Sequence, residues 1–113
     1  MADRLVPVLV ALGGFLGATA RHLLGTVVAG PGGTLLANVV GSFALALAVG
    51  VVRSTRLRFF LMTGLLSSFT TYSTFAVETA SLGPALGAVN VAATYALGFA
   101  AAVLGLLAGR RWV

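Results

Sequence analysis

The sequence has no cysteine and no lysine, and its only acidic residues are Asp3 and Glu78. The absence of cysteine excludes disulfides, zinc–thiolate sites and thiol catalysis. Charged residues make up 8% of the 113 residues, whereas a soluble domain usually carries about 25%. A chain this short would bury too little surface to hide its 59% of hydrophobic residues from water. The composition excludes a soluble enzyme, a DNA-binding domain and a disordered tail, and it indicates an integral membrane protein.

Four apolar stretches are each long enough, at about 20 residues or more, for a helix to cross a hydrocarbon core about 30 Å thick. They cover residues 5–29, 34–52, 57–80 and 85–108, which use nearly the whole chain. Turns containing glycine and proline separate the outer pairs, and an arginine cluster separates the middle pair. The sequence therefore predicts an all-α, polytopic membrane protein made of one four-helix transmembrane domain.

The arginines predict how the chain lies in the membrane. With four spans, the two termini and the second loop share one side, and the other two loops contain no arginine. The shared side holds six arginines: Arg4, Arg53, Arg56, Arg58, Arg110 and Arg111. The positive-inside rule then places both termini in the cytoplasm, with Trp112 as an interfacial anchor. Because the basic residues lie between apolar runs, no nucleic-acid partner is expected.

Small residues recur four positions apart within the spans. The pairs are Gly13 and Gly17, Gly14 and Ala18, Gly83 and Gly87, and Gly105 and Gly109. Such pairs allow helix backbones to approach closely in lipid, where no hydrophobic effect drives association. Because four tightly packed helices enclose little interior, we expect a polar pathway to form between subunits of an oligomer.

Polar side chains within membrane helices usually face the bundle interior or a watery cavity. Thr34, Asn38 and Ser42 are four residues apart and share one face of the second span. Threonine and serine often bond to carbonyls of their own helix, but the Asn38 amide has two donors that a helix does not easily satisfy. A structural contact and a functional role are equally open for Asn38.

The third span contains an unusual run from Ser67 to Phe75, in which seven of the nine side chains carry a hydroxyl. Hydroxyls compete for backbone hydrogen bonds, so we expect the helix to break near its centre. A break exposes carbonyl oxygens suited to a cation and N–H groups suited to an anion. Tyr72 and Phe75 offer ring edges, which are positive and contact a small anion, although such a pair is more often only packing.

The ionisable groups at membrane depth are Arg21 with His22 in the first span and Glu78 in the third. Arg21 either attracts anions or extends to the interface, and Glu78 is either a proton carrier or a structural partner. Tyr95 is most simply a packing residue of the fourth span.

The sequence has no nucleophile–base pair, metal-ligand cluster or glycine-rich phosphate loop, so we do not expect an enzyme. Its oxygen donors suit a hard cation such as Na⁺.

The sequence resembles the fluoride channels of the Fluc/CrcB family along its full length. One matching motif is Gly13-Gly14-Phe15-Leu16-Gly17-Ala18 with Arg21, and a second is Thr34 and Asn38 followed by Gly41-Ser42-Phe43. The most specific motif is Thr70-Thr71-Tyr72-Ser73-Thr74-Phe75 with Glu78. The resemblance implies an antiparallel dimer that encloses two narrow fluoride pores in the cytoplasmic membrane.

The resemblance also implies roles for individual residues. Asn38 would donate to fluoride, and Tyr72 and Phe75 would form ring-edge contacts. The other polar pore residues would be Ser73, Thr74, Thr34 and Tyr95. A structural Na⁺ at the dimer centre would be held by the main-chain carbonyls of Ser67 and Ser68 from each subunit. Structural or electrostatic roles would fall to Arg21, Thr71 and Glu78.

This sequence departs from the family pattern in ways that bear on conduction. Tyr72 stands where the family usually has phenylalanine, and Ser67 and Ser68 replace a commoner glycine-rich pair. Phe99 and Val103 are apolar where a track of hydroxyls would continue from Tyr95. We therefore expect that a pore lined mainly by this subunit conducts fluoride less well than a pore with the full family pattern.

The arginine distribution of six against none makes insertion in both orientations rare, which predicts a heterodimer with an oppositely oriented homologous subunit. A proton-coupled small multidrug transporter is an alternative of similar size, but it needs a carboxylate in the first span, which has none. A non-conducting accessory membrane subunit is the third interpretation.

Overall fold

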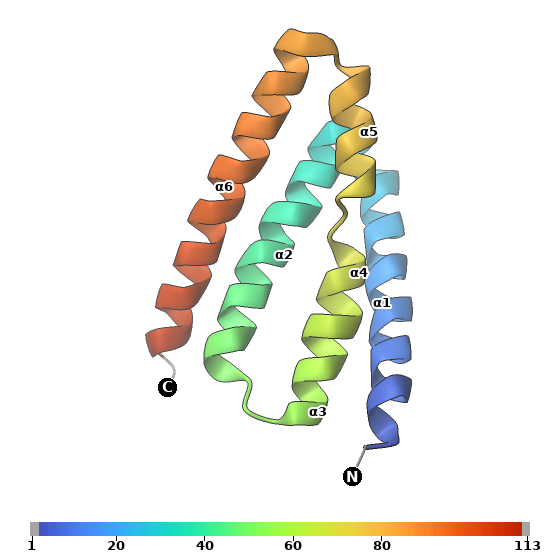
Figure 1. Ribbon diagram of the computed structural model, residues 1–113, viewed down its shortest axis with the longest axis vertical. Coiled ribbons are helices and arrows are strands. Elements are labelled where there is room, and N and C mark those ends of the chain that lie inside the picture. The colour runs from blue at the N-terminus through green and yellow to red at the C-terminus, as the bar shows by residue number, and fades with distance from the viewer. Residues whose placement is uncertain (1–2, 112–113) are drawn as a thin grey trace.

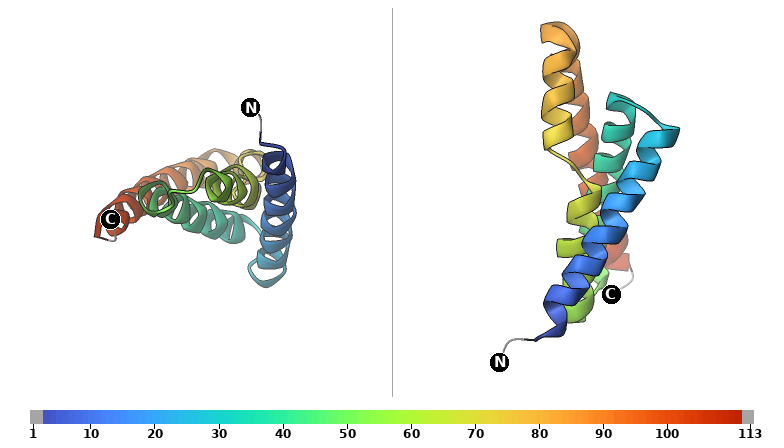
Figure 2. Two further views of the ribbon diagram at one scale, coloured as in Figure 1. Left: turned by 90° about the horizontal axis from the view of Figure 1, so that it is seen from below. Right: turned by 90° about the vertical axis from the view of Figure 1, so that its right-hand side faces the viewer.

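The computed structural model describes residues 3–111, which form an elongated helical bundle of 50 × 30 × 25 Å (Figure 1). Three of its helices are long and apolar enough to cross a membrane: α1 (Leu5–Val27), α2 (Pro31–Val51) and α6 (Gly83–Arg111). In the right-hand view of Figure 2, α1 runs obliquely across the other helices. Trp112 lies outside the described residues.

Between α2 and α6 the chain forms shorter helical segments. They are α3 (Thr55–Arg58), the π-helix η1 (Phe59–Leu66), α4 (Ser67–Phe69) and α5 (Ser73–Ser81). The first three follow one another without interruption, but Thr70 is extended, with φ −78° and ψ 156°. Residues 70–72 therefore separate α4 from α5 (Figure 1).

Glycines with positive φ begin two of the long helices. Gly30 has φ 75° and precedes Pro31, and Gly83 has φ 83°. Residues with a side chain disfavour a positive φ, whereas glycine adopts it freely. Proline suits the first turn of a helix because a backbone N–H at that position would have no partner within the helix. Both turns lie at the end of the bundle opposite to the chain termini (Figure 1).

The N-terminus, α3 and the C-terminal end of α6 lie at the same end of the bundle (Figure 1). An ion pair joins two of these segments, with 2.7 Å between Arg56 Nε and Asp3 Oδ2. Asp3 also accepts a hydrogen bond from the Leu5 amide through Oδ1, at 3.0 Å. The hydrogen bond from Arg56 is the main cause that lowers the pKa of the Asp3 carboxyl, and the Leu5 amide adds to it.

Glycines bring α1 into main-chain contact with η1. A Cβ on Gly13 would lie 2.8 Å from Leu65 N and 3.0 Å from the Cα of Gly64. A Cβ on Gly17 would overlap the main chain of Leu65. We call this contact, made by Gly13, Gly17 and Gly64, the α1–η1 seam.

A second glycine contact joins α2 to α6. A Cβ on Gly105 would lie 2.9 Å from the Cβ of Ala46, and a Cβ on Gly50 would lie 3.2 Å from the Cα of Gly109. We call this contact, made by Gly50, Gly105 and Gly109, the α2–α6 seam. The predicted packing through small residues is confirmed for Gly13 with Gly17 and for Gly105 with Gly109, whereas a Cβ on Gly83 would meet nothing within 4 Å.

The interior of the chain is small and its surface is apolar. Buried hydrophobic residues are mostly alanines, such as Ala37 and Ala101, whereas Phe15 is 68% exposed and Val27 is 82% exposed. A soluble monomer rarely displays so much apolar surface, which instead suits contact with lipid or another subunit. The fold is that of a helical membrane protein.

Candidate functional site

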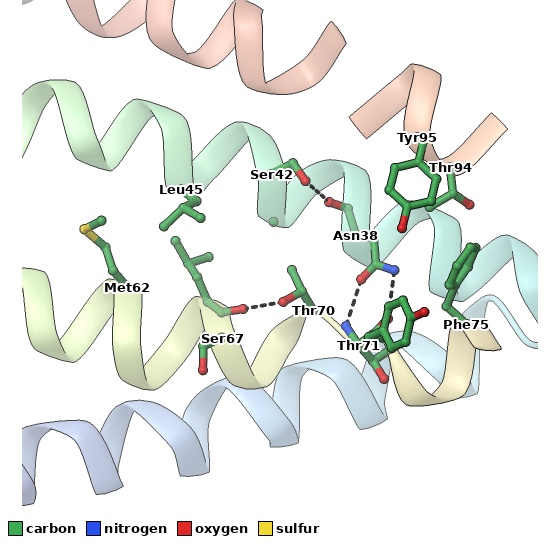
Figure 3. Close-up of a pocket in the computed structure, with 13 residues that line it drawn as sticks. Asn38, Ser42, Leu45, Met62, Ser67, Thr70, Thr71, Phe75, Thr94 and Tyr95 are labelled. Atoms are coloured by element: carbon green, nitrogen blue, oxygen red, sulfur yellow. Dashed lines mark hydrogen bonds between the residues drawn. The ribbon is translucent and has the colours of Figure 1, made fainter. Parts of the chain in front are cut away.

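Asn38 on α2 holds the main chain of Thr71, which lies between α4 and α5. Its Nδ2 donates to the Thr71 carbonyl at 3.0 Å, and its Oδ1 accepts from the Thr71 amide at 2.8 Å (Figure 3). A helix end leaves main-chain groups without helical partners, and these two bonds satisfy both groups of one residue. We call this pair of hydrogen bonds the Asn38–Thr71 clasp.

Threonine hydroxyls end α4 and begin α5. Thr70 Oγ1 donates to the carbonyl of Leu66 at 3.1 Å, and Thr71 Oγ1 accepts from the Thr74 amide at 3.3 Å. These are the local side-chain bonds with which threonine competes against a continuous helix. The hydroxyl run thus supplies part of the bonding that a continuous helix would otherwise provide.

The end of α4 presents main-chain oxygen atoms. Within residues 3–111, no backbone N–H donates to the carbonyl oxygen of Ser67 or Ser68. For Ser67, the amide four residues later is that of Thr71, which bonds to Asn38 instead. Unwound carbonyls of this kind coordinate Na⁺ in membrane proteins. The donor set of these two serines therefore fits the cation that the sequence comparison implied, although one chain offers only part of a coordination shell.

A cavity of about 390 Å³ lies beside the Asn38–Thr71 clasp (Figure 3). Three aromatic residues line one part of it: Tyr72, Phe75 and Tyr95. The ring centroids of Tyr72 and Phe75 are 6.0 Å apart, and those of Phe75 and Tyr95 are 6.2 Å apart with an interplanar angle of 84°. Phe75 is 7% exposed, but Tyr72 is 74% exposed on the surface of the single chain. We call these three residues the ring cluster.

A second cavity of about 400 Å³ lies between α2 and α6. Its lining shares five residues with the first cavity: Asn38, Ser42, Leu45, Thr94 and Tyr95. The rest of its lining is apolar and consists of Ala46, Val49, Gly98, Phe99 and Ala102. The Tyr95 and Phe99 rings are 5.9 Å apart and continue the ring cluster along α6.

Arg21 lies in a third, more polar cavity of about 480 Å³ on the other side of residues 70 and 71. Its Nη2 donates to Thr34 Oγ1 at 2.9 Å, and its buried Nε has no partner among the described residues. His22 and Thr74 also line this cavity. Since Thr70 and Thr71 line both this cavity and the one beside the ring cluster, they form the wall between them.

The structure does not gather every predicted pore residue around one cavity. Thr34 is 2% exposed and bonds to Arg21, and it does not line the cavity beside the clasp. Ser73 is exposed at the start of α5 and lines neither the cavity beside the clasp nor the Arg21 cavity. Ser67 lines the cavity beside the clasp, whereas Ser68 lines the Arg21 cavity.

Glu78 and Thr94 each carry a buried oxygen that has no hydrogen-bond partner among the described residues. Glu78 is on α5 and lines neither the cavity beside the clasp nor the Arg21 cavity. Sequence reasoning missed Thr94, which lines two cavities. The signal that was available is a hydroxyl directly before Tyr95 in an otherwise apolar stretch.

A family described as CrcB-like protein, camphor resistance (CrcB), matches residues 8–106. The chain belongs to the CrcB family. This match includes the clasp, the ring cluster and Arg21. The chain is 52% identical over 103 residues to fluoride-specific ion channel FluC 2 of Halobacterium salinarum, covering 86% of this chain and 80% of the relative.

Two further relatives match a larger share of the chain. Fluoride-specific ion channel FluC 1 of Haloarcula marismortui is 51% identical, with 94% of this chain and 84% of the relative covered. Fluoride-specific ion channel FluC of Cereibacter sphaeroides is 41% identical, with 92% and 94% covered. CrcB relatives thus carry the names of ion channels rather than enzymes.

Proposed function

We propose that this chain is a subunit of a channel that lets fluoride leave the cell passively across the cytoplasmic membrane. The observation that carries the proposal is the Asn38–Thr71 clasp, which holds a break in a membrane-embedded segment beside the ring cluster. Fluoride is strongly hydrated, so a passage must replace water with donors that do not bind too tightly. The second N–H of Asn38 and the positive ring edges of Phe75 are donors of this kind.

The complete pore requires a second subunit in this proposal. Tyr72 is part of the ring cluster but is 74% exposed on a single chain, so a partner would cover it and close the passage. The free carbonyls of Ser67 and Ser68 would meet those of an antiparallel subunit and hold a central Na⁺. A buried cation would offset part of the cost of removing water from the anion.

The partner in this proposal is a homologous chain of opposite orientation. Six arginines are associated with the termini and the second loop, and the fold brings these three regions to one end of the bundle (Figure 1). The positive-inside rule favours that end in the cytoplasm, with both termini inside. A single sequence with this bias would rarely insert the other way, which favours a heterodimer.

Fluoride efflux from liposomes tests the proposed activity. The chain is reconstituted alone and with a homologue of opposite charge bias, and released fluoride is followed with a selective electrode. We expect rapid efflux with the partner, little efflux of chloride, and no requirement for a pH gradient. Vesicles that retain fluoride under both conditions would contradict the proposal, whereas efflux that requires a proton gradient and Glu78 would favour the transporter.

Because the chain has no cysteine, single-cysteine labelling tests its orientation without background. Ser54→Cys and Ser81→Cys place a thiol at opposite ends of the bundle. With a membrane-impermeant maleimide on intact cells, we expect labelling of Ser81→Cys only. Equal labelling of both variants would contradict the single orientation and with it the heterodimer.

The Na⁺ site is tested by replacing sodium with N-methylglucamine and measuring the dimer fraction and efflux together. We expect both to fall and to recover when Na⁺ returns. Unchanged dimer and efflux after exhaustive exchange would contradict a structural Na⁺.

A further inference from the structure

The cavities along α6 change from polar to apolar towards the end of the bundle that carries the six arginines. The cavity between α2 and α6 has polar residues around Asn38 and ends at the apolar Val49 and Ala102. A further cavity of about 320 Å³ is lined by the next residue of each helix, Gly50 and Val103. These two cavities therefore follow one another along the same pair of helices.

The further cavity, which we call the Arg110 groove, is apolar except at its end. Its lining is Gly50, Val103, Leu106, Leu107 and Arg110. The three aliphatic side chains are exposed on the single chain, and Arg110 belongs to the last turn of α6. Between residues 99 and 110, α6 advances about 16 Å along its axis. One leaflet contributes a similar length, about 15 Å, to a hydrocarbon core about 30 Å thick.

Arg110 has no anionic partner within residues 3–111. The arginine side chains that make hydrogen bonds in this part of the chain are Arg21, Arg56 and Arg58. Of the two acidic residues, Asp3 is paired with Arg56, and Glu78 is on α5 and does not line the groove. The groove thus combines an apolar floor with an uncompensated cation at one end.

We propose that the Arg110 groove binds an anionic phospholipid, with an acyl chain along Val103, Leu106 and Leu107 and the headgroup phosphate on Arg110. The planar guanidinium suits a phosphate because it donates two parallel hydrogen bonds. An acyl chain in a groove gains van der Waals contacts on more sides than a chain at a convex helix surface. Basic side chains near the membrane surface attract anionic lipids, which supplies the headgroup where Arg110 needs it.

This inference goes beyond the proposed channel function and does not depend on it. Phe99 and Val103 carry no hydroxyl, so an acyl chain beside them displaces no donor that a passing anion could use. A ligand that binds only the folded state raises its stability, so we expect the lipid to raise the melting temperature of the chain.

Lipid titration of the purified protein in detergent tests the groove, with bound lipids counted by native mass spectrometry. The probes are palmitoyl-oleoyl phosphatidylglycerol and phosphatidylcholine with the same chains. We expect phosphatidylglycerol to bind about fivefold more tightly, because no choline offsets its phosphate charge. Dihexanoyl phosphatidylglycerol has the same headgroup on short chains, and it should bind at least about tenfold more weakly because it buries fewer methylene groups.

Arg110→Gln removes the cation at the end of the groove. We expect it to weaken phosphatidylglycerol binding about tenfold, as the loss of a hydrogen bond to a charged group predicts. Arg111→Gln is the matched control, because Arg111 is the next residue, is also exposed and does not line the groove. It makes the same change in net charge and should keep the affinity within about twofold of wild type.

Val103→Phe fills the apolar part of the groove and should weaken the binding of both long-chain lipids severalfold. Leu104→Phe is its control, since Leu104 is an exposed neighbour on α6 that does not line the groove. Melting temperatures without added lipid should be the same for all four variants. If Val103→Phe lowers this temperature, the comparison of Arg110→Gln with Arg111→Gln decides alone.

Three results would overturn the lipid site. Equal losses in Arg110→Gln and Arg111→Gln would show a general attraction to the arginine-rich end. Equal binding of the dihexanoyl and long-chain lipids would show that no acyl chain lies in the groove. Release of the lipid on addition of the partner subunit would show that a protein surface occupies it instead. In each case fluoride efflux is measured separately, so the proposed function stands or falls by its own experiment.

Discussion

At the α1–η1 seam, the main chains of two helices touch because Gly13 and Gly64 have no side chains. Between α2 and the break at residues 70–72, by contrast, the Asn38 side chain makes the connection, and a cavity lies beside it. In lipid, close van der Waals packing replaces the hydrophobic effect as the force between helices. The seams therefore provide a rigid frame that excludes water and ions. The region between them retains the polar groups and the space that ion passage requires.

The largest expected effect comes from filling a seam. In Gly13→Leu, the new side chain must displace main-chain atoms of Leu65 and Gly64, which cannot move without moving η1. We expect a loss of about 3 kcal/mol of stability and no monodisperse protein in size-exclusion chromatography. Gly14→Ala is the control, since its Cβ would meet only Ser68 Oγ at 3.4 Å. A monodisperse Gly13→Leu protein with wild-type melting temperature would show that the seam is not tightly packed.

The next largest effect is expected from Asn38→Asp, which removes one of the two hydrogen bonds of the clasp without filling space. The aspartate cannot donate to the Thr71 carbonyl, and its charge repels both that oxygen and an approaching anion. We expect fluoride efflux to fall at least about tenfold, because a buried carbonyl is left without its donor.

Asn90→Asp is the matched control for the clasp. Asn90 Nδ2 donates to Thr79 Oγ1 at 2.9 Å, and that hydroxyl is able to reverse its role and donate to an aspartate. Efflux should stay within about twofold of wild type. Equal losses in the two variants would mean that any buried charge stops the flux, independently of the clasp.

Phe75→Ile should have an intermediate effect. Phe75 is 7% exposed and its ring lies near both Tyr72 and Tyr95, so isoleucine removes the central ring edges and leaves a small void. We expect a severalfold loss of efflux and a loss of about 1–2 kcal/mol in stability. Phe15→Ile, in which the original ring is 68% exposed and lines neither the cavity beside the clasp nor the cavity between α2 and α6, should change neither quantity measurably. If Phe75→Ile conducts like wild type, ring edges do not contact the ion.

The smallest effect is expected at the arginine-rich end of the bundle. The pKa of the Asp3 carboxyl is lowered by its hydrogen bond from Arg56, so its contribution to stability is present above the ordinary carboxyl pKa and is lost as pH falls through the lowered value. Asp3→Asn should lower the melting temperature at pH 7 by no more than about 2 °C. The difference should vanish in acid, where wild-type Asp3 is also neutral. Arg53→Gln, which leaves this ion pair intact, should show no such pH dependence.

Composition and turn chemistry predict much of the frame. The apolar stretches locate α1, α2 and α6 because their length and hydropathy are dictated by the bilayer, and Gly30 with Pro31 marks the turn between the first two. The π-helical geometry of η1 has no such signal, since Phe59–Leu66 is an ordinary apolar segment in sequence.

The site is less accessible to sequence reasoning. Asn38 is conspicuous as an amide in an apolar helix, but its partner is a main-chain group 33 residues away, and main-chain groups look alike at every position. The bond from Arg21 to Thr34 joins residues 13 positions apart on two helices and could not be read from the sequence, and the pore-lining role of Thr34 stays a prediction. Thr94 was missed because its buried hydroxyl lacks a hydrogen-bond partner within residues 3–111, which only three-dimensional packing reveals.

The clasp binds Thr71 through its amide and carbonyl, not through its side chain. Nineteen of the twenty standard amino acids offer those same two groups, and proline alone lacks the N–H. The clasp alone therefore excludes only proline at residue 71, whereas it limits residue 38 to one amide of one length. Any further constraint on residue 71 comes from its hydroxyl, which accepts the Thr74 amide at the start of α5.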